Sequence, residues 1–105
     1  MDTRFDSERR RNRRVATSIY GRLVYRGVDT ECFIKQMSAT GALVEATPLP
    51  ALHLPVALSV PGIGFAHGTS IRYSAGLLCI RLHPTMSHEQ FMADRLADPA
   101  RRVQH

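Results

Sequence analysis

The fold is decided by residues 15–26, which read VATSIYGRLVYR. Apolar or small side chains occupy every second position, and the positions between them include Ser18, Arg22 and Arg26. The alternating set consists of Val15, Thr17, Ile19, Gly21, Leu23 and Tyr25. A period of two residues is typical of a β-strand with one buried and one exposed face. We therefore expect a half-buried strand here, followed by a turn at residues 26–29.

Five more segments have the composition of short strands. They lie at residues 30–36, 42–46, 54–60, 65–73 and 77–82. Proline cannot donate to a sheet ladder, so Pro48, Pro50 and Pro61 mark strand ends between them. Short strands at close spacing indicate an all-β fold, either a small antiparallel barrel or a sandwich. We favour the barrel because its closure leaves no strand edge exposed.

Alternation also assigns side chains to the faces of these strands. In residues 30–36, Cys32 and Ile34 share one face, and Glu31, Phe33 and Lys35 share the other. In residues 65–73, one face is made of Phe65, His67, Thr69, Ile71 and Tyr73. The residues after the last strand change character and predict a helix. Ser87 and Gln90 have the spacing of a capping box.

The expected helix has a short apolar stripe of Phe91, Met92 and Leu96. It should end near Pro99 because proline cannot continue a helix. We expect this short C-terminal helix to pack on the barrel. Barrel and helix together form one domain, residues 15–105.

Residues 1–14 form a separate, arginine-rich segment. They hold six arginines against three carboxylates, and five of the arginines fall within residues 9–14. No apolar periodicity is present, so we expect a flexible arm that becomes ordered when a ligand binds. A guanidinium offers a planar fork of donors that fits phosphate or the O6/N7 edge of guanine. The alternative is a solvated basic tail with general affinity for nucleic acid.

The composition, 44% hydrophobic and 22% charged, is ordinary for a soluble globular protein. Cys32 and Cys79 lie in strand-like segments, and we expect both to be reduced core residues. We find neither a signal peptide nor an apolar run of membrane-spanning length, so we expect a cytoplasmic protein.

The sequence contains no pattern that indicates catalysis. Its five histidines are scattered without metal-ligand spacing, and we expect surface or capping roles for them. No serine has a nucleophile setting and no carboxylates are paired. We therefore expect a binding module that is not an enzyme and holds no metal or cofactor.

A polar turn at residues 36–41 is the second candidate site. Gln36 carries an amide donor and acceptor, Ser38 a hydroxyl, and Gly41 permits a positive φ or a close approach by a ligand. In the simpler interpretation this is an ordinary hairpin in which Ser38 bonds its own backbone.

The arm and the turn together resemble the paired motifs of PilZ domains, RxxxR and [D/N]xSxxG. The matching residues are Arg10-x-x-x-Arg14 and, one strand pair later, Gln36-x-Ser38-x-x-Gly41. The likeness extends over residues 8–97. It implies a six-stranded antiparallel barrel that binds the bacterial second messenger cyclic di-GMP.

The resemblance also implies a role for each matching residue. Arg10 and Arg14 would grip guanine edges and phosphates, while Gln36, Ser38 and Gly41 would line the barrel side. The arm would fold over the ligand and so alter contact with a downstream protein partner. Arg9 would stack on a second ligand molecule, as an arginine there is thought to do in some relatives.

Gln36 departs from the family pattern, which has Asp or Asn at this position. A neutral glutamine lacks the charge-assisted acceptor of an aspartate, which is a loss of about 1.5–3 kcal/mol. Two alternatives to a cyclic di-GMP receptor therefore stay open. One is a degenerate PilZ-like adaptor that binds only protein, and the other, less favoured, is non-specific nucleic-acid binding by the arm.

Overall fold

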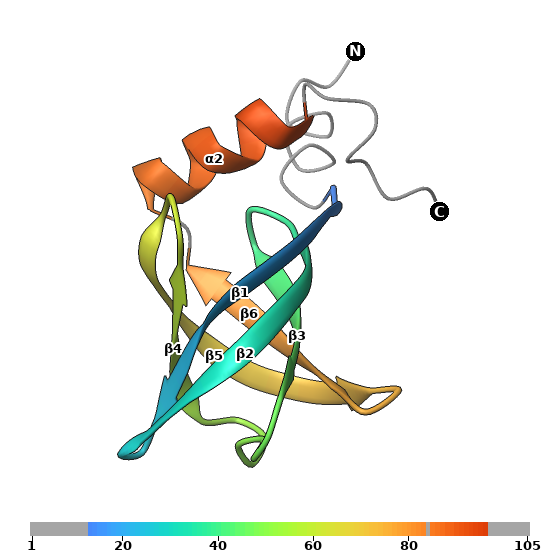
Figure 1. Ribbon diagram of the computed structural model, residues 1–105, viewed down its shortest axis with the longest axis vertical. Coiled ribbons are helices and arrows are strands. Elements are labelled where there is room, and N and C mark those ends of the chain that lie inside the picture. The colour runs from blue at the N-terminus through green and yellow to red at the C-terminus, as the bar shows by residue number, and fades with distance from the viewer. Residues whose placement is uncertain (1–12, 84, 97–105) are drawn as a thin grey trace.

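Six strands and one helix make up the described part of the chain (Figure 1). The computed structural model describes residues 13–83 and 85–96. The elements are β1 Val15–Tyr25, β2 Val28–Met37, β3 Gly41–Ala46, β4 Pro55–Val60, β5 Gly64–Ser74, β6 Leu77–His83 and α2 Met86–Leu96. Most of the expected arm, including Arg9 and Arg10, lies outside the described residues.

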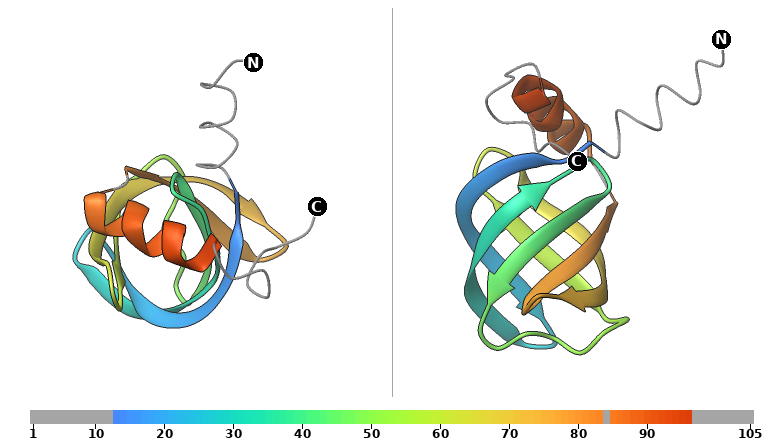
Figure 2. Two further views of the ribbon diagram at one scale, coloured as in Figure 1. Left: turned by 90° about the horizontal axis from the view of Figure 1, so that it is seen from above. Right: turned by 90° about the vertical axis from the view of Figure 1, so that its right-hand side faces the viewer.

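The strands form one closed barrel in the order β1-β2-β3-β6-β5-β4. Every neighbouring pair is antiparallel, and β4 pairs with β1 to complete the ring, which the left view in Figure 2 shows from above. Gly21 permits this closure, since a Cβ there would run into the carbonyl oxygen of Ser59 on β4. The prediction of an all-β, six-stranded antiparallel barrel with a short C-terminal helix is confirmed.

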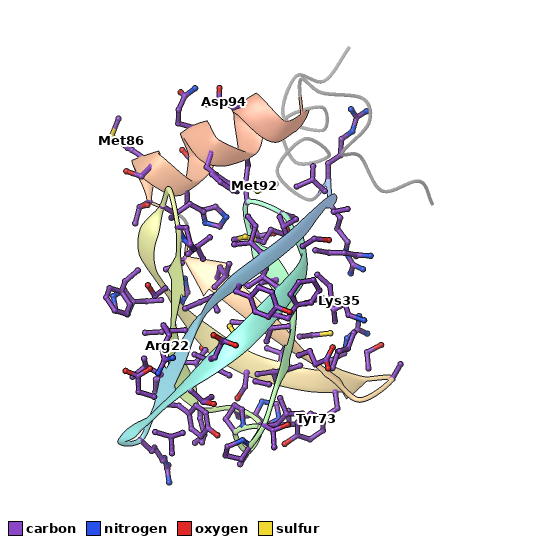
Figure 3. The ribbon with its side chains drawn as sticks, in the orientation of Figure 1. Arg22, Lys35, Tyr73, Met86, Met92 and Asp94 are labelled. Carbon is purple, nitrogen blue, oxygen red and sulfur yellow. The ribbon has the colours of Figure 1, made fainter. Side chains whose placement is uncertain are left out.

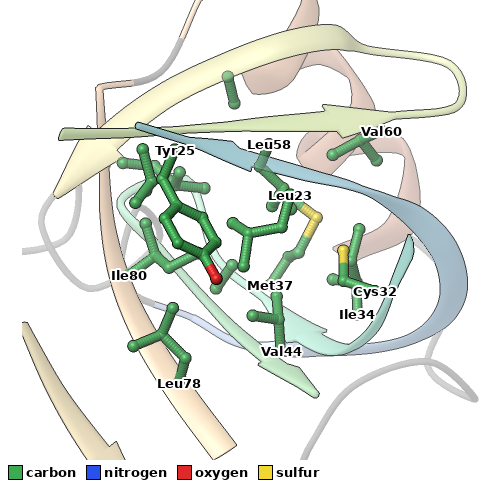
Figure 4. Close-up of a cluster of buried hydrophobic side chains, with 14 of the residues drawn as sticks. Leu23, Tyr25, Cys32, Ile34, Met37, Val44, Leu58, Val60, Leu78 and Ile80 are labelled. Carbon is green, nitrogen blue, oxygen red and sulfur yellow. The ribbon is translucent and has the colours of Figure 1, made fainter. Parts of the chain in front are cut away.

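The core lies inside the barrel and comes from the inward face of every strand. Figure 4 shows part of it, with Leu23, Ile34, Leu58 and Ile80 meeting across the interior. In β1 five of the six residues of the predicted inward set are buried, and the sixth, Ile19, is half-buried beside a register shift. Burying large aliphatic side chains at about 1.5–3 kcal/mol each is the main force that favours the closed barrel.

Most strand boundaries lie within one residue of the sequence expectation, but the start of β2 differs by two residues. β1 and β2 are joined by Arg26 and Gly27 alone, so β2 begins at Val28 rather than Thr30. Both turn residues have positive φ, as the tight hairpin turns that match strand twist require. The expected four-residue turn was therefore too long.

Helix α2 covers one end of the barrel (Figures 1 and 3). Met92 lies on the side that faces the barrel and is 2% exposed, whereas Met86 points away. The cap is Thr85, whose hydroxyl accepts the N–H of His88 at 3.2 Å. The prediction of Ser87 as the cap was wrong, because Ser87 already lies inside the helix. No helix among the described residues is long and apolar enough to cross a membrane.

Candidate ligand-binding site

A cavity of about 290 Å³ lies against the outer wall of the barrel beside the β2–β3 turn. It brings together the residues of both sequence motifs that the structure describes, namely Arg14, Gln36, Ser38 and Gly41. Beside them it is lined by Met37, Thr40, Ala42, Leu43, Ile71, Arg72, Cys79, Ile80 and Arg81. The described lining contains three arginines and no carboxylate, so the cavity is electropositive.

Arg14 reaches this cavity because of the β1–β2 register. Val15 pairs with Met37, so Arg14, one residue earlier, lies beside the start of the turn at Ser38. Its side chain is exposed and lines the cavity. Arg14, the described residue of the first motif, therefore lies on the same side of the barrel as the second motif.

Hydrogen bonds within the turn fix its shape. The N–H of Ser38 donates to the carbonyl of Gly41 at 2.9 Å, and the N–H of Thr40 donates to Oγ of Ser38 at 3.3 Å. The N–H of Leu82 on β6 donates to the carbonyl of Thr40 at 2.9 Å. Ser38 thus bonds its own backbone, as the simpler interpretation held. Because its oxygen accepts there, the hydroxyl keeps its proton for an acceptor such as a phosphate oxygen.

Gly41 contributes to the site because it has no side chain, and not because of an unusual backbone conformation. It is not among the residues with positive φ, so of the two possibilities only the close approach by a ligand stays a prediction. A Cβ at Gly41 would lie 3.3 Å from the carbonyl oxygen of Ile80 and 3.6 Å from Oγ of Ser38. The missing side chain therefore leaves the floor of the cavity open beside the Ser38 hydroxyl.

A bulge in β2 turns Gln36 toward the cavity. The β2–β3 register shifts between Ile34 and Gln36, so Ile34 points inward and Gln36 pairs with the outward Leu43. The hydroxyl of Thr17 donates to the carbonyl of Ile34 at 2.7 Å beside this irregularity and stabilises it. Oε1 of Gln36 is buried and has no hydrogen-bond partner among the described residues. Gln36 thus offers the site an unused acceptor.

A second bulge, in β5, brings Arg72 to the same wall. The β5–β6 register shifts between Ser70 and Arg72, so the buried Ser70 faces Ile80 and Arg72 pairs with the outward Cys79. The expectation that Tyr73 shares a face with Phe65 was wrong, because the shift places Tyr73 opposite the buried Leu78. Without the bulge, Arg72 would point into the barrel.

Sequence reasoning missed the two arginines from the far strands, Arg72 and Arg81. Arg81 pairs with Gly41 in the β3–β6 ladder, so its side chain projects beside the place that the glycine leaves open. Arg72 and Arg81 are both exposed, and both line the cavity. One feature of the sequence could have indicated Arg81 as a site residue. It is an arginine between two aliphatic residues, Ile80 and Leu82, of the last strand, which places its side chain on the outer face.

Cys79 also differs from its expected role. It is half-buried on the outer wall and lines the cavity, so it is not a core residue. Cys32 is buried inside the barrel, as expected, and burial raises the pKa of its thiol to about 11. Both thiols are free, and only Cys79 is open to reagents that enter the cavity.

His88 joins helix α2 to the backbone of the turn. It is fully buried, and its Nε2–H donates to the carbonyl of Ser38 at 3.0 Å. The expected surface or capping role for this histidine was wrong. Burial lowers the pKa of His88, although the bond to Ser38 and the neighbouring Glu89 oppose the shift. Nδ1 has no partner in the described part of the chain, so the neutral ring fits the site better than the charged ring.

We expect His88→Phe to lower the free energy of unfolding at pH 7.5 by about 1–3 kcal/mol, because the Ser38 carbonyl loses its buried donor. Wild-type stability should fall as the pH drops below about 6.5, since the unfolded chain then takes up a proton that folded His88 resists. The fall should be smaller in His88→Phe. Urea unfolding at pH 7.5 and 5.5 measures both quantities.

The exposed His67 on β5 provides a matched control. His67→Phe should change the free energy of unfolding at pH 7.5 by no more than about 0.5 kcal/mol. Equal losses for the two variants would contradict the assignment of a buried hydrogen bond to His88.

No group of three or more metal-ligating side chains is found among residues 13–83 and 85–96. The site described above consists of cations, amide and hydroxyl groups, a thiol, and mostly aliphatic apolar side chains. Such a set binds anions and polar rings.

The barrel, its helix and the turn beside β3 have a PilZ-like fold. Among solved structures, the chain is similar to the crystal structure of the Borreliella burgdorferi PlzA protein in complex with c-di-GMP, with a TM-score of 0.62 and 23% identity. The match covers 90% of this chain and 37% of PlzA, so the chain spans little more than a third of that protein. No family model and no curated protein matches the sequence.

Proposed function

We propose that this chain is a cyclic di-GMP receptor module that binds its ligand in the cavity beside the β2–β3 turn. The observation that carries the proposal is the convergence of Arg14, Gln36, Ser38 and Gly41 on one electropositive cavity. These residues belong to motifs separated by a whole strand pair. The complex of PlzA with c-di-GMP supports the same ligand class.

The chemistry of the lining suits a guanine dinucleotide. Arg14 offers a forked donor for a phosphate or for the O6/N7 edge of guanine. Oε1 of Gln36, which has no partner in the described residues, can accept an N–H from the opposite edge of the base. The Ser38 hydroxyl can donate to a phosphate oxygen. Leu43 and Ile71, both half-buried, give the base an apolar surface to rest on.

In this proposal residues 1–14 act as the moving part of the receptor. Arg9 and Arg10 would close over a ligand already held against the barrel, with Arg10 gripping it beside Arg14 and Arg9 stacking on a second ligand molecule. Ordering the arm would change the surface beside α2 and the turn, and so change contact with a downstream protein partner. The signal is thus a change of surface and involves no chemical step.

Isothermal titration of the purified chain with cyclic di-GMP tests the proposal. We expect saturable heat at micromolar ligand and much weaker binding of cyclic di-AMP, which has the same phosphates but lacks the guanine edges. No heat at high micromolar cyclic di-GMP would end the proposal.

The cavity also contains its own reporter, Cys79. Saturating cyclic di-GMP should slow alkylation of this thiol at least about fivefold, because a ligand seated on the wall excludes the reagent. Cys32 is an internal control, since its burial and its pKa of about 11 keep it unreactive with or without ligand. Binding that leaves the alkylation rate of Cys79 unchanged would show that the ligand lies elsewhere.

A second candidate function, a protein-binding adaptor, is favoured by a different surface. Tyr20 and Phe33 pair across β1 and β2 on the outside of the barrel, with ring centroids 4.9 Å apart. Tyr20 is 64% exposed, and exposed aromatic side chains are enriched at protein interfaces. This surface would serve an adaptor whether or not the cavity takes a nucleotide.

A further inference from the structure

Two arginines outside both sequence motifs extend the cavity away from the turn. Arg81 on β6 pairs with Gly41, and Arg72 on β5 pairs with Cys79 one strand further round the barrel. Both side chains are exposed and line the same cavity as Arg14. The cationic surface therefore continues onto two strands, β6 and β5, beyond the residues that the motifs include.

The three arginines that line the cavity favour a ligand with more than one negatively charged group. Arg14, Arg72 and Arg81 surround one cavity, and none of them forms an ion pair with a carboxylate in the described part of the chain. By contrast, Arg22 on β1, which does not line the cavity, forms an ion pair with Asp29 at 2.9 Å. Like charges gathered without partners repel one another, and a polyanionic ligand would remove that cost.

The register of the strands gives the spacing between the two ends of the cavity. Gln36, Leu43, Cys79 and Arg72 are successive cross-strand partners on β2, β3, β6 and β5, so they form one row on the outer wall. Strands lie about 4.8 Å apart, so the path along the curved wall from Gln36 to Arg72 is about 14 Å, and the direct distance is shorter. The middle of the row is apolar, and each end carries polar or cationic groups.

A cyclic dinucleotide has two phosphodiesters on opposite sides of one ring. A ligand held at the turn by Arg14, Gln36 and Ser38 presents only one of these groups to that end of the row. We propose that Arg72 and Arg81 form a second anion subsite, which binds the phosphodiester that lies away from Arg14. This inference rests on the proposed function and adds two residues from β5 and β6 to its site.

Titration of Arg72→Gln and Arg81→Gln with cyclic di-GMP tests the inference. Each variant should bind about five- to tenfold more weakly, because a charge-assisted contact to phosphate is lost at a partly solvated position. The double variant should lose about thirtyfold or more. Arg26→Gln, at the exposed β1–β2 turn, removes the same charge far from the cavity and should bind like wild type.

The variants Arg72→Lys and Arg81→Lys keep the positive charge. They therefore show whether the glutamine variants lose affinity through the missing charge or through a change in the fold. Lysine binds phosphate as a point charge, so these variants should keep affinity within about threefold of wild type. Glutamine variants that bind like wild type would overturn the second subsite while leaving the receptor function intact. A lysine pair as weak as the glutamine pair would overturn phosphate as its ligand. Wild-type protein that takes no cyclic di-GMP would overturn both proposals.

Discussion

Replacing Arg14 by alanine should weaken cyclic di-GMP binding at least about a hundredfold and leave the fold unchanged. The side chain is exposed and lies at the junction of arm and barrel, so its removal leaves no gap in the core. In the proposed complex it makes two charge-assisted hydrogen bonds, each of which contributes about 1.5–3 kcal/mol. The lower bound of their sum corresponds to a change in dissociation constant of about two orders of magnitude.

The measurement is isothermal titration, with thermal unfolding as the check on the fold. Arg26→Ala is the matched control, because it removes an equally exposed arginine at the opposite end of β1. It should bind like wild type. If Arg14→Ala also binds like wild type, the ligand does not use this cavity, whatever the affinity of the wild-type protein.

Changing Gln36 to aspartate should strengthen cyclic di-GMP binding about ten- to a hundredfold. Gln36 lines the cavity, and its buried Oε1 has no hydrogen-bond partner among the described residues, so the position suits an acceptor. A carboxylate there would accept from guanine N–H groups with a full charge, which adds about 1.5–3 kcal/mol to the interaction. The lining is electropositive, and Arg14 would keep the new carboxylate ionised.

Gln36→Asn separates the charge from the length of the side chain. It shortens the side chain as aspartate does but stays neutral, so we expect a change in affinity of no more than about threefold. Equal gains for the two variants would show that length, and not charge, limits the natural site. If neither the wild-type protein nor Gln36→Asp binds the dinucleotide, the adaptor function and its Tyr20–Phe33 surface become the better explanation.

Much of the fold follows from local sequence. Residues that alternate with period two can bury one face only in a sheet, and six such segments separated by Gly and Pro turns close most simply into a barrel. Thr85, three residues before His88, determined where the helix begins, yet the sequence pattern favoured Ser87. Both are hydroxyl residues with similar capping propensity, so only the packing of α2 on the barrel distinguishes them.

The two motifs are sufficient to indicate four of the residues that line the cavity, namely Arg14, Gln36, Ser38 and Gly41. Their grouping in one cavity depends on the pairing of Val15 with Met37, which no motif states. Arg72, Arg81 and His88 could not be found in this way. Arg72 and Arg81 come from strands that follow the turn by about thirty residues or more, and His88 is a common polar residue in an ordinary helix.

By itself, the sequence determined the number of strands, the inward face of β1 and the identity of the two motifs. These properties depend on side-chain chemistry repeated at short range. Only the tertiary structure decided which way Gln36 and Arg72 point. Each follows a bulge, and one extra residue in a strand reverses every side chain beyond it. Such an irregularity is stabilised by residues on neighbouring strands, and the hydrogen bond from Thr17 to the carbonyl of Ile34 is an example. Because these partners are distant in the sequence, a bulge leaves no local pattern there.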